Sequence, residues 1–204
     1  MDHAQSEEEI IAASAYDFDS IMVDMSHYEK EENLEKTARI TKMLHDKGIA
    51  TEAEPGRING GEDGVKDTGD LEGLLTDEFQ ATQFLDTGID FLAPAFGNIH
   101  GSYGGVENIK LDFPRLHMLQ ETCKGRAQLV LHGTNTFPDE TMRACVKGGM
   151  TRCNVNELVL FRYNEYVKEK QGKVPLTQLM MEGTRLIQVE IEHQMDVLGS
   201  TGKA

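Results

Sequence analysis

Short apolar runs alternate with amphipathic segments along this 204-residue chain, and the alternation restricts the fold more than any other feature. The runs occupy positions 20–23, 49–53, 89–93, 128–131 and 152–155. Runs of this length and composition are typical of parallel strands that are buried on both faces. Helical patterns separate them at positions 6–15, 31–47, 76–85, 138–148, 157–170 and 177–198. The sequence therefore predicts an α/β protein with a five-stranded parallel sheet.

The length of the chain bears on which parallel architecture it forms. An eight-stranded β/α barrel typically uses about 250 residues, more than this chain contains. Met1-Asp2-His3 leads directly into the first helical pattern, as the end of a strand would. No repeat, linker or low-complexity segment divides the sequence, so we expect a single domain over residues 1–204.

Charge and composition exclude several classes of protein. Twenty Lys and Arg against 35 Asp and Glu give a net charge of −15, which disfavours nucleic acid and anionic lipid as partners. No apolar run approaches the twenty residues of a membrane span, and the acidic first ten residues do not resemble a secretory signal. The three cysteines lack CxxC spacing, so we expect buried, reduced thiols in a cytoplasmic protein.

Three histidines stand at or just beyond the ends of predicted strands. They are His3, His100 and His132, and glycine directly follows the last two. Ligands of parallel α/β proteins meet the carboxyl ends of the strands. Catalytic zinc commonly takes three protein ligands and keeps a fourth position open. A single histidine in such a place is more often a hydrogen-bonded loop residue, but three on different strands indicate a metal site.

Several segments in the same order resemble the class II, metal-dependent fructose- and tagatose-bisphosphate aldolases. The resemblance covers essentially the whole chain and rests on residues 2–4, 19–27, 52–58, 96–101, 131–133, 154–156 and 198–203. It implies a TIM (β/α)8 barrel whose first two strands and most of the third are not in this sequence. It also implies an aldehyde-lyase of carbohydrate metabolism, such as glycolysis, that cleaves or forms a ketose (bis)phosphate, with dihydroxyacetone phosphate and an aldehyde as the other partners. Members commonly form dimers or larger homo-oligomers.

The resemblance also implies roles for particular residues. The histidines match ligands of a divalent ion, usually Zn²⁺, and Asp24 and Glu54 match positions that hold a second or alternative metal. Asp2 matches the acid/base that works on the aldehyde oxygen, and Glu62 matches the loop carboxylate that handles the C–H proton. The matching substrate positions, which would bind phosphate largely through backbone amides, are Gly101, Gly133, Thr134, Asn135, Asn154 and Asn156.

Two departures from the family pattern bear on activity. Gly133-Thr134-Asn135-Thr136 stands where the family usually has Gly-Gly-Ser-Gly, and Glu157 stands where it has Thr. A carboxylate near a phosphate dianion is repulsive, which is consistent with a less phosphorylated substrate or with loss of function. Two alternatives therefore stay open: a truncated, non-catalytic remnant that binds at most a metal or a partner, and an unrelated metal-dependent α/β hydrolase that uses the same histidines.

Overall fold

The computed structural model describes residues 1–61 and 73–203. Strands and helices alternate through most of these residues, as the sequence predicts. The strands are β1 (Ser20–Val23), β2 (Ala50–Ala53), β3 (Phe91–Leu92), β4 (Gln128–Leu131) and β5 (Met150–Cys153). The α-helices are α1 (Glu7–Ala13), α2 (Lys30–His45), α3 (Glu78–Asp86), α4 (Phe113–Cys123), α5 (Asp139–Lys147), α6 (Glu157–Lys170) and α7 (Leu176–Leu198). A short 3₁₀ helix, η1 (Val106–Asn108), precedes α4.

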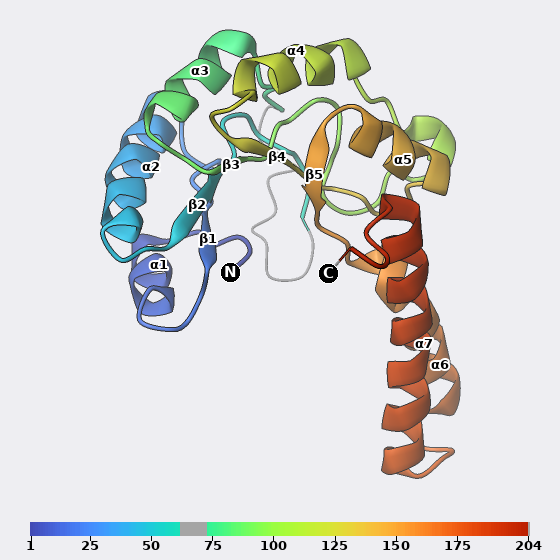
Figure 1. Ribbon diagram of the computed structural model, residues 1–204. Helices are drawn as coiled ribbons and strands as arrows, with labels where there is room; N and C mark the ends of the chain where they lie inside the picture. Colours follow the sequence, from blue (N-terminus) through green and yellow to red (C-terminus); the bar gives the residue numbers. More distant parts are fainter. Residues whose placement is uncertain (62–72, 204) are drawn as a thin grey trace.

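The five strands form one parallel sheet in the order β1-β2-β3-β4-β5, so each strand pairs with its neighbours in the sequence. Figure 1 shows the sheet as an inner arc with helices α1 to α5 outside it. Strand followed by helix, with sequential strands adjacent, is the arrangement of a β/α barrel wall. The expected α/β class with a parallel sheet is therefore confirmed.

The first four residues extend this sheet beyond β1. Ala4 forms a parallel bridge with Val23, and its amide donates to the carbonyl of Met22 at 3.1 Å. The N-terminal segment therefore runs alongside β1 as a strand end would, in agreement with the sequence. The pairing places His3 at the same edge of the sheet as the residues that follow β1.

The core lies between the sheet and the outer helices. The larger cluster joins strands β2 to β5 with α3, α4 and α5, and includes Phe84, Phe96, Leu116, Leu131 and Met142. A second cluster packs α1 and α2 on β1, through residues such as Ile10, Ile21 and Leu44. Burial of these side chains holds the strand ends in a fixed relation to one another.

Some predicted boundaries shift in the structure. The last strand spans Met150–Cys153 rather than positions 152–155. Helix α3 begins at Glu78 rather than at position 76, and Asp77 caps it, because the Asp77 carboxylate accepts from the Gln80 amide at 2.7 Å. The Thr76 hydroxyl instead accepts from the Ala95 amide and joins two loops. Boundaries depend on such tertiary contacts, which the local pattern does not contain.

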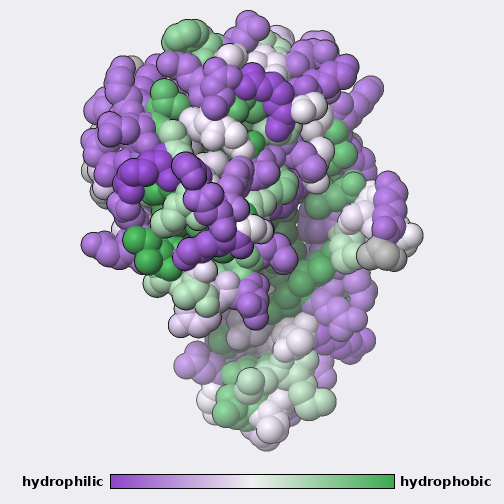
Figure 2. Space-filling view, turned by 60° about the vertical axis from the view of Figure 1, so that its left-hand side comes forward, coloured by the Kyte–Doolittle hydropathy of each residue, from purple (hydrophilic) through white to green (hydrophobic). Residues whose placement is uncertain are grey.

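Helices α6 and α7 form a hairpin that extends away from the sheet (Figure 1). The C-terminal part of α7 remains attached to the core, because Val197 is buried in the larger cluster and His193 bonds Asp139 of α5 at 3.0 Å. Three large apolar side chains at the start of α7, Leu176, Met180 and Met181, are strongly exposed. Figure 2 shows green and pale side chains at the surface of this lower part of the molecule. Among the described residues, no helix is both long and apolar enough to span a membrane.

Candidate metal centre

Three parts of the sheet bring the predicted histidines together at its carboxyl edge. His3 lies in the N-terminal segment beside β1, His132 directly follows β4, and His100 lies in the loop after β3. The His100 loop is held by the amide of His100, which donates to the carbonyl of Asn59 at 2.7 Å. His3 has a φ of 45°, a left-handed backbone conformation that is uncommon for a residue other than glycine. The fold therefore holds His3 in a strained conformation that turns it towards the other two rings.

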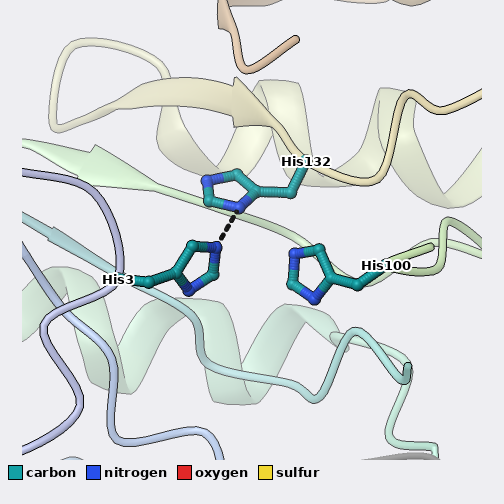
Figure 3. Close-up of side chains that lie close together, drawn as sticks. All are labelled: His3, His100 and His132. Carbon is teal, nitrogen blue, oxygen red and sulfur yellow. Dashed lines mark hydrogen bonds between the residues drawn. The ribbon is translucent and has the colours of Figure 1, made fainter. Parts of the chain in front are cut away.

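The three imidazole rings face one another (Figure 3). Each offers one ring nitrogen to a group in which all such atoms lie within 4.8 Å of one another. Nε2 of His3 lies 3.0 Å from Nδ1 of His132, and Nε2 of His100 is buried without a hydrogen-bond partner. A buried orphaned nitrogen beside two converging nitrogens is an arrangement that a bound cation would satisfy.

The far nitrogens of the same rings are held by other groups. Asp24 Oδ2 lies 2.7 Å from Nδ1 of His3, and Glu52 Oε1 lies 2.8 Å from Nε2 of His132. The ring of His100 hydrogen-bonds the backbone of Ile58. Metal-binding histidines nearly always have such a partner, because it fixes the tautomer and the ring orientation. The residues present therefore fit a metal bound through three imidazoles.

Electrostatics distinguish the three rings. Burial alone would lower the pKa of His3, but the hydrogen bond and the charge of Asp24 outweigh it and raise that pKa to about 9. Burial and the charges of the other two histidines lower the pKa of His100 to about 3. Burial likewise lowers the pKa of His132. A neutral imidazole is the form that binds a metal, so His100 and His132 are already in that form at neutral pH.

The two carboxylates that the resemblance matches to a second metal site lie close to the histidines but differ from each other. Asp24 is saturated: it accepts from His3, from Gln5, and from both the amide and the hydroxyl of Ser26. Glu54 accepts from the Ile58 amide through Oε1, while its Oε2 is buried without a partner. Burial, and then the charge of Asp24, raise the pKa of Glu54 to about 7. Of the two, Glu54 retains an oxygen that could approach a cation.

Of the two predicted acid/base residues, Asp2 lies beside the histidine cluster. Asp2 Oδ1 lies 3.9 Å from Nε2 of His3 and accepts from Asn154 Nδ2 at 3.0 Å, so this carboxylate is at the edge of the histidine cluster. Its side chain is 59% exposed, which leaves it accessible from solvent. Glu62 lies outside the described residues.

The predicted substrate-binding residues line the same edge, but several already bond within the protein. The Thr134 hydroxyl donates to the carbonyl of Asn154 at 2.7 Å, and the side-chain oxygen of Asn135 accepts from the Glu157 amide at 3.2 Å. Asn156 precedes α6 without a side-chain capping bond. Gly101 and Gly133 adopt φ of 84° and 66°, and a Cβ on Gly133 would lie 2.2 Å from the carbonyl oxygen of Ile99. At Gly133, glycine is therefore required for the His100 and His132 loops to approach each other.

Two residues that take part in the centre received no role from the sequence. Glu52 contacts His132, and Arg152 of β5 forms an ion pair with the other carboxylate oxygen of Glu52. The available signal was a charged residue inside a strand that is otherwise apolar or small. Because side chains alternate along a strand, Glu52 and Glu54 point to the same face. The pattern alone does not show that His132 would be opposite Glu52.

Comparisons with known proteins identify the family of the chain. The family model described as "Fructose-bisphosphate aldolase class-II" matches residues 1–203. A Coccidioides immitis protein named "Putative fructose-bisphosphate aldolase" is 47% identical over 212 residues, which is 100% of this chain and 70% of that protein. A fructose-bisphosphate aldolase of Streptococcus pneumoniae is 36% identical over 92% of this chain and 66% of its own length. The chain thus spans about two thirds of the length of these curated relatives.

Solved structures show the same fold. One is the crystal structure of a putative fructose-1,6-biphosphate aldolase from Coccidioides immitis, with a TM-score of 0.95 and 48% identity. The match covers 99% of this chain and 71% of that one. The YdjI aldolase of Escherichia coli K12 has a TM-score of 0.83 at 28% identity, and 69% of its length is covered. The expected barrel-type fold is confirmed, with a five-stranded arc of the sheet present here. The chain therefore belongs to the class II fructose-bisphosphate aldolases, a family of aldehyde-lyases.

Proposed function

We propose that the protein cleaves or forms a ketose phosphate, such as fructose or tagatose 1,6-bisphosphate, by aldol chemistry at the histidine cluster. The observation that carries the proposal is the convergence of His3, His100 and His132, whose far nitrogens are already held by hydrogen bonds. This arrangement supports a metal at a fixed position at the carboxyl edge of the sheet, where barrel enzymes bind their substrates.

Zn²⁺ is the metal that the donor set favours. Three imidazole nitrogens with a fourth position left open are typical of catalytic zinc. When bound, such a metal supplies Lewis-acid polarisation of the substrate ketone. Glu54 is the further group that could join the ligands or a second metal, because one of its oxygens has no partner. Asp24 has a supporting part in this proposal, since its oxygens already hold His3, Gln5 and Ser26.

The protein's own groups divide the proton transfers and the binding of substrate. Asp2, which is exposed beside His3, takes or gives the proton of the aldehyde oxygen. Glu62 handles the proton on carbon. The amides and side chains that orient the phosphorylated substrate come from the loops after β3, β4 and β5, and they are those of Gly101, Gly133, Thr134, Asn135, Asn154 and Asn156. Asn154 also bonds Asp2, so it keeps this carboxylate at the edge of the cluster.

Turnover with and without metal tests the proposal. We expect zinc-loaded protein to release dihydroxyacetone phosphate from fructose 1,6-bisphosphate or from tagatose 1,6-bisphosphate, and a chelator to abolish this release. Asp2→Asn should retain zinc and lose turnover. Folded protein that holds one zinc and cleaves neither sugar would leave the alternative of a family member that binds metal without catalysis. The product also separates aldol cleavage, which yields two carbonyl compounds, from hydrolysis.

The same proposal covers the domain organisation, the location and the oligomeric state of the protein. We propose one domain over residues 1–204, with the hairpin as its extension, and a location in the cytoplasm, which the three free cysteines support. We further propose a homodimer. Its support is the exposed apolar patch at the start of α7, formed by Leu176, Met180 and Met181 and called here the hairpin patch.

A further inference from the structure

The carboxylate of Glu52 is placed between two partners that come from different strands. Its Oε1 lies 2.8 Å from Nε2 of His132, and its Oε2 pairs with the guanidinium of Arg152. Both carboxylate oxygens are therefore engaged, and the side chain is 2% exposed. A carboxylate that is buried to this degree and bound at both oxygens has a fixed orientation.

The second partner, Arg152, is itself fixed. Its guanidinium lies over the ring of Phe91, 4.1 Å from the ring centre, and its Nη1 lies 3.4 Å from the hydroxyl of Ser20. These contacts come from β3 and β1, across the inside of the arc from β5. Arg152 therefore ties Glu52 of β2 to three other strands, and it supplies the positive charge that a buried carboxylate needs.

The consequence falls on His132. An ionised carboxylate only accepts hydrogen bonds, and Glu52 Oε1 lies closer to Nε2 of His132, at 2.8 Å, than the amide nitrogen of Asn154 does, at 3.2 Å. Glu52 therefore selects the tautomer of His132 that carries its proton on Nε2. The lone pair then lies on Nδ1, which is the nitrogen that faces His3 at 3.0 Å. His3 shows the opposite arrangement, because Asp24 holds its Nδ1 and leaves Nε2 facing the cluster. Glu52 thus decides which nitrogen of His132 is presented.

We propose that Glu52 and Arg152 are a positioning pair: Glu52 fixes the Nδ1 lone pair of His132 toward the metal, and Arg152 fixes Glu52. The inference rests on the proposed function for the presence of the metal. Neither residue contacts the reacting atoms in this scheme, and Glu52 is not a ligand, because both of its oxygens are taken. Groups that orient a metal ligand typically change metal affinity by about 10–100-fold when they are removed.

Zinc affinity measured by chelator competition, without substrate, tests the pair. We expect Glu52→Gln to bind one zinc with about 10–100-fold weaker affinity than the native chain. Arg152→Met should weaken binding by about tenfold, and Arg152→Lys should restore most of it because the charge returns. The double variant Glu52→Gln/Arg152→Met should be no weaker than Glu52→Gln, because both changes act through His132.

A matched control is Glu190→Gln on α7. Glu190 is also a largely buried carboxylate, with a side chain that is 12% exposed and an ion pair to Arg162 at 2.9 Å, but it lies on the hairpin. We expect its zinc affinity to equal that of the native chain. Circular dichroism and thermal unfolding of each metal-free variant verify that it folds. Zinc affinity of Glu52→Gln within twofold of the native chain, or an equal loss in Glu190→Gln, would overturn the proposal.

The ¹⁵N resonances of His132 give a readout that needs neither metal nor activity. In the metal-free native chain we expect the Nε2–H tautomer, and in Glu52→Gln a mixture of the two tautomers. A native His132 that carries its proton on Nδ1 overturns the positioning pair, whatever the activity. A native chain that shows the full affinity series and no aldol cleavage contradicts the proposed function and supports the pair. The two failures are therefore distinguishable.

Discussion

The carboxyl edge of the sheet and the α6–α7 hairpin differ in what holds them together. At the edge, side chains bond residues far away in the sequence, as His132 does with Glu52 and Glu52 does with Arg152. On the hairpin, bonds join the two helices to each other or lie within one helix, as between Arg162 and Glu190 or between Gln188 and Glu192, and His193 attaches α7 to α5. His132 is 1% exposed, whereas Leu176 is 69% exposed.

This difference shows that the two regions meet different requirements. The edge must hold several nitrogen and oxygen atoms in place, so it depends on the relative positions of all five strands. The hairpin depends on the packing of two helices on each other and on α5. We therefore expect changes at the edge to act on the metal and on global stability together. Changes at the free end of the hairpin should act on association and leave the metal unaffected.

The largest expected effect comes from removal of His100, whose Nε2 faces the other two histidines and has no hydrogen-bond partner. His100→Ala should weaken zinc binding by about 100-fold or more, since structural and catalytic sites share a large binding free energy among few ligands. Turnover should fall with it. Zinc stoichiometry by elemental analysis and affinity by chelator competition measure the effect.

The control for this change is His117→Ala, which removes an exposed histidine from α4. Its zinc affinity should equal that of the native chain. If His100→Ala keeps one tightly bound zinc, the ligand set proposed here is wrong.

Two glycines with nearly the same backbone conformation allow a direct comparison of the two regions. Gly133 at the edge has a φ of 66° and Gly199 at the end of α7 has a φ of 70°. An alanine in this left-handed region costs about 1 kcal/mol at either position. Only at Gly133 would the new Cβ meet a backbone oxygen, that of Ile99 at 2.2 Å, while nothing lies within 4 Å at Gly199.

We therefore expect Gly133→Ala to lower the free energy of unfolding by about 3 kcal/mol or more, because overpacking adds to the conformational cost. Gly199→Ala should lower it by about 1 kcal/mol. Denaturant unfolding of both variants measures the difference. Equal losses would show that the loops after β3 and β4 can separate without cost, contrary to the tight approach seen here.

The sequence predicted the strands and the three histidines of the edge, but it did not predict the contacts between their side chains. The strand–helix alternation and the three histidines at strand ends are local patterns that the shared edge of a parallel sheet converts into proximity. The Glu52–His132 contact joins positions 80 residues apart, and the hydrogen bond between Asp24 and His3 likewise does not follow from any local pattern. Such pairings depend on strand register and on rotamers, which no local pattern contains.

Glu54 provides a test of how burial acts on one carboxylate of the edge. Its pKa is about 7 in the folded chain against an ordinary value of 4.5, mainly because it is buried. As the pH rises from about 4.5, the unfolded chain releases this proton first, so the metal-free fold loses stability until the pH passes about 7. Above that pH the full cost is present, on the order of 3 kcal/mol.

Glu54→Gln removes the charge and with it this cost. We expect the metal-free variant to be more stable than the native chain at pH 8 and equally stable at pH 4, as measured by denaturant unfolding. A Glu54→Gln variant that is less stable than the native chain at pH 8 would mean that the charged form is held by a favourable partner.

The smallest effect on stability, and the sharpest separation of the two regions, is expected at the hairpin patch. Leu176→Glu combined with Met181→Glu places two charges on side chains that are 69% and 73% exposed. Exposed substitutions usually change the free energy of unfolding by less than about 0.5 kcal/mol, so folding and zinc affinity should stay unchanged. If this patch is buried in a homodimer, the same charges would have to be desolvated there, and the dimer should dissociate.

Sedimentation of the native chain and of this double variant measures the association. Phe79→Glu is the matched control, because Phe79 on α3 is also 73% exposed but belongs to the helices that cover the sheet. We expect the control to sediment as the native dimer and the double variant as a monomer that still binds zinc. A double variant that remains dimeric would move the interface away from the hairpin. A monomer that loses zinc would show that association also holds the edge together, because the ligands themselves all lie on the described part of this chain.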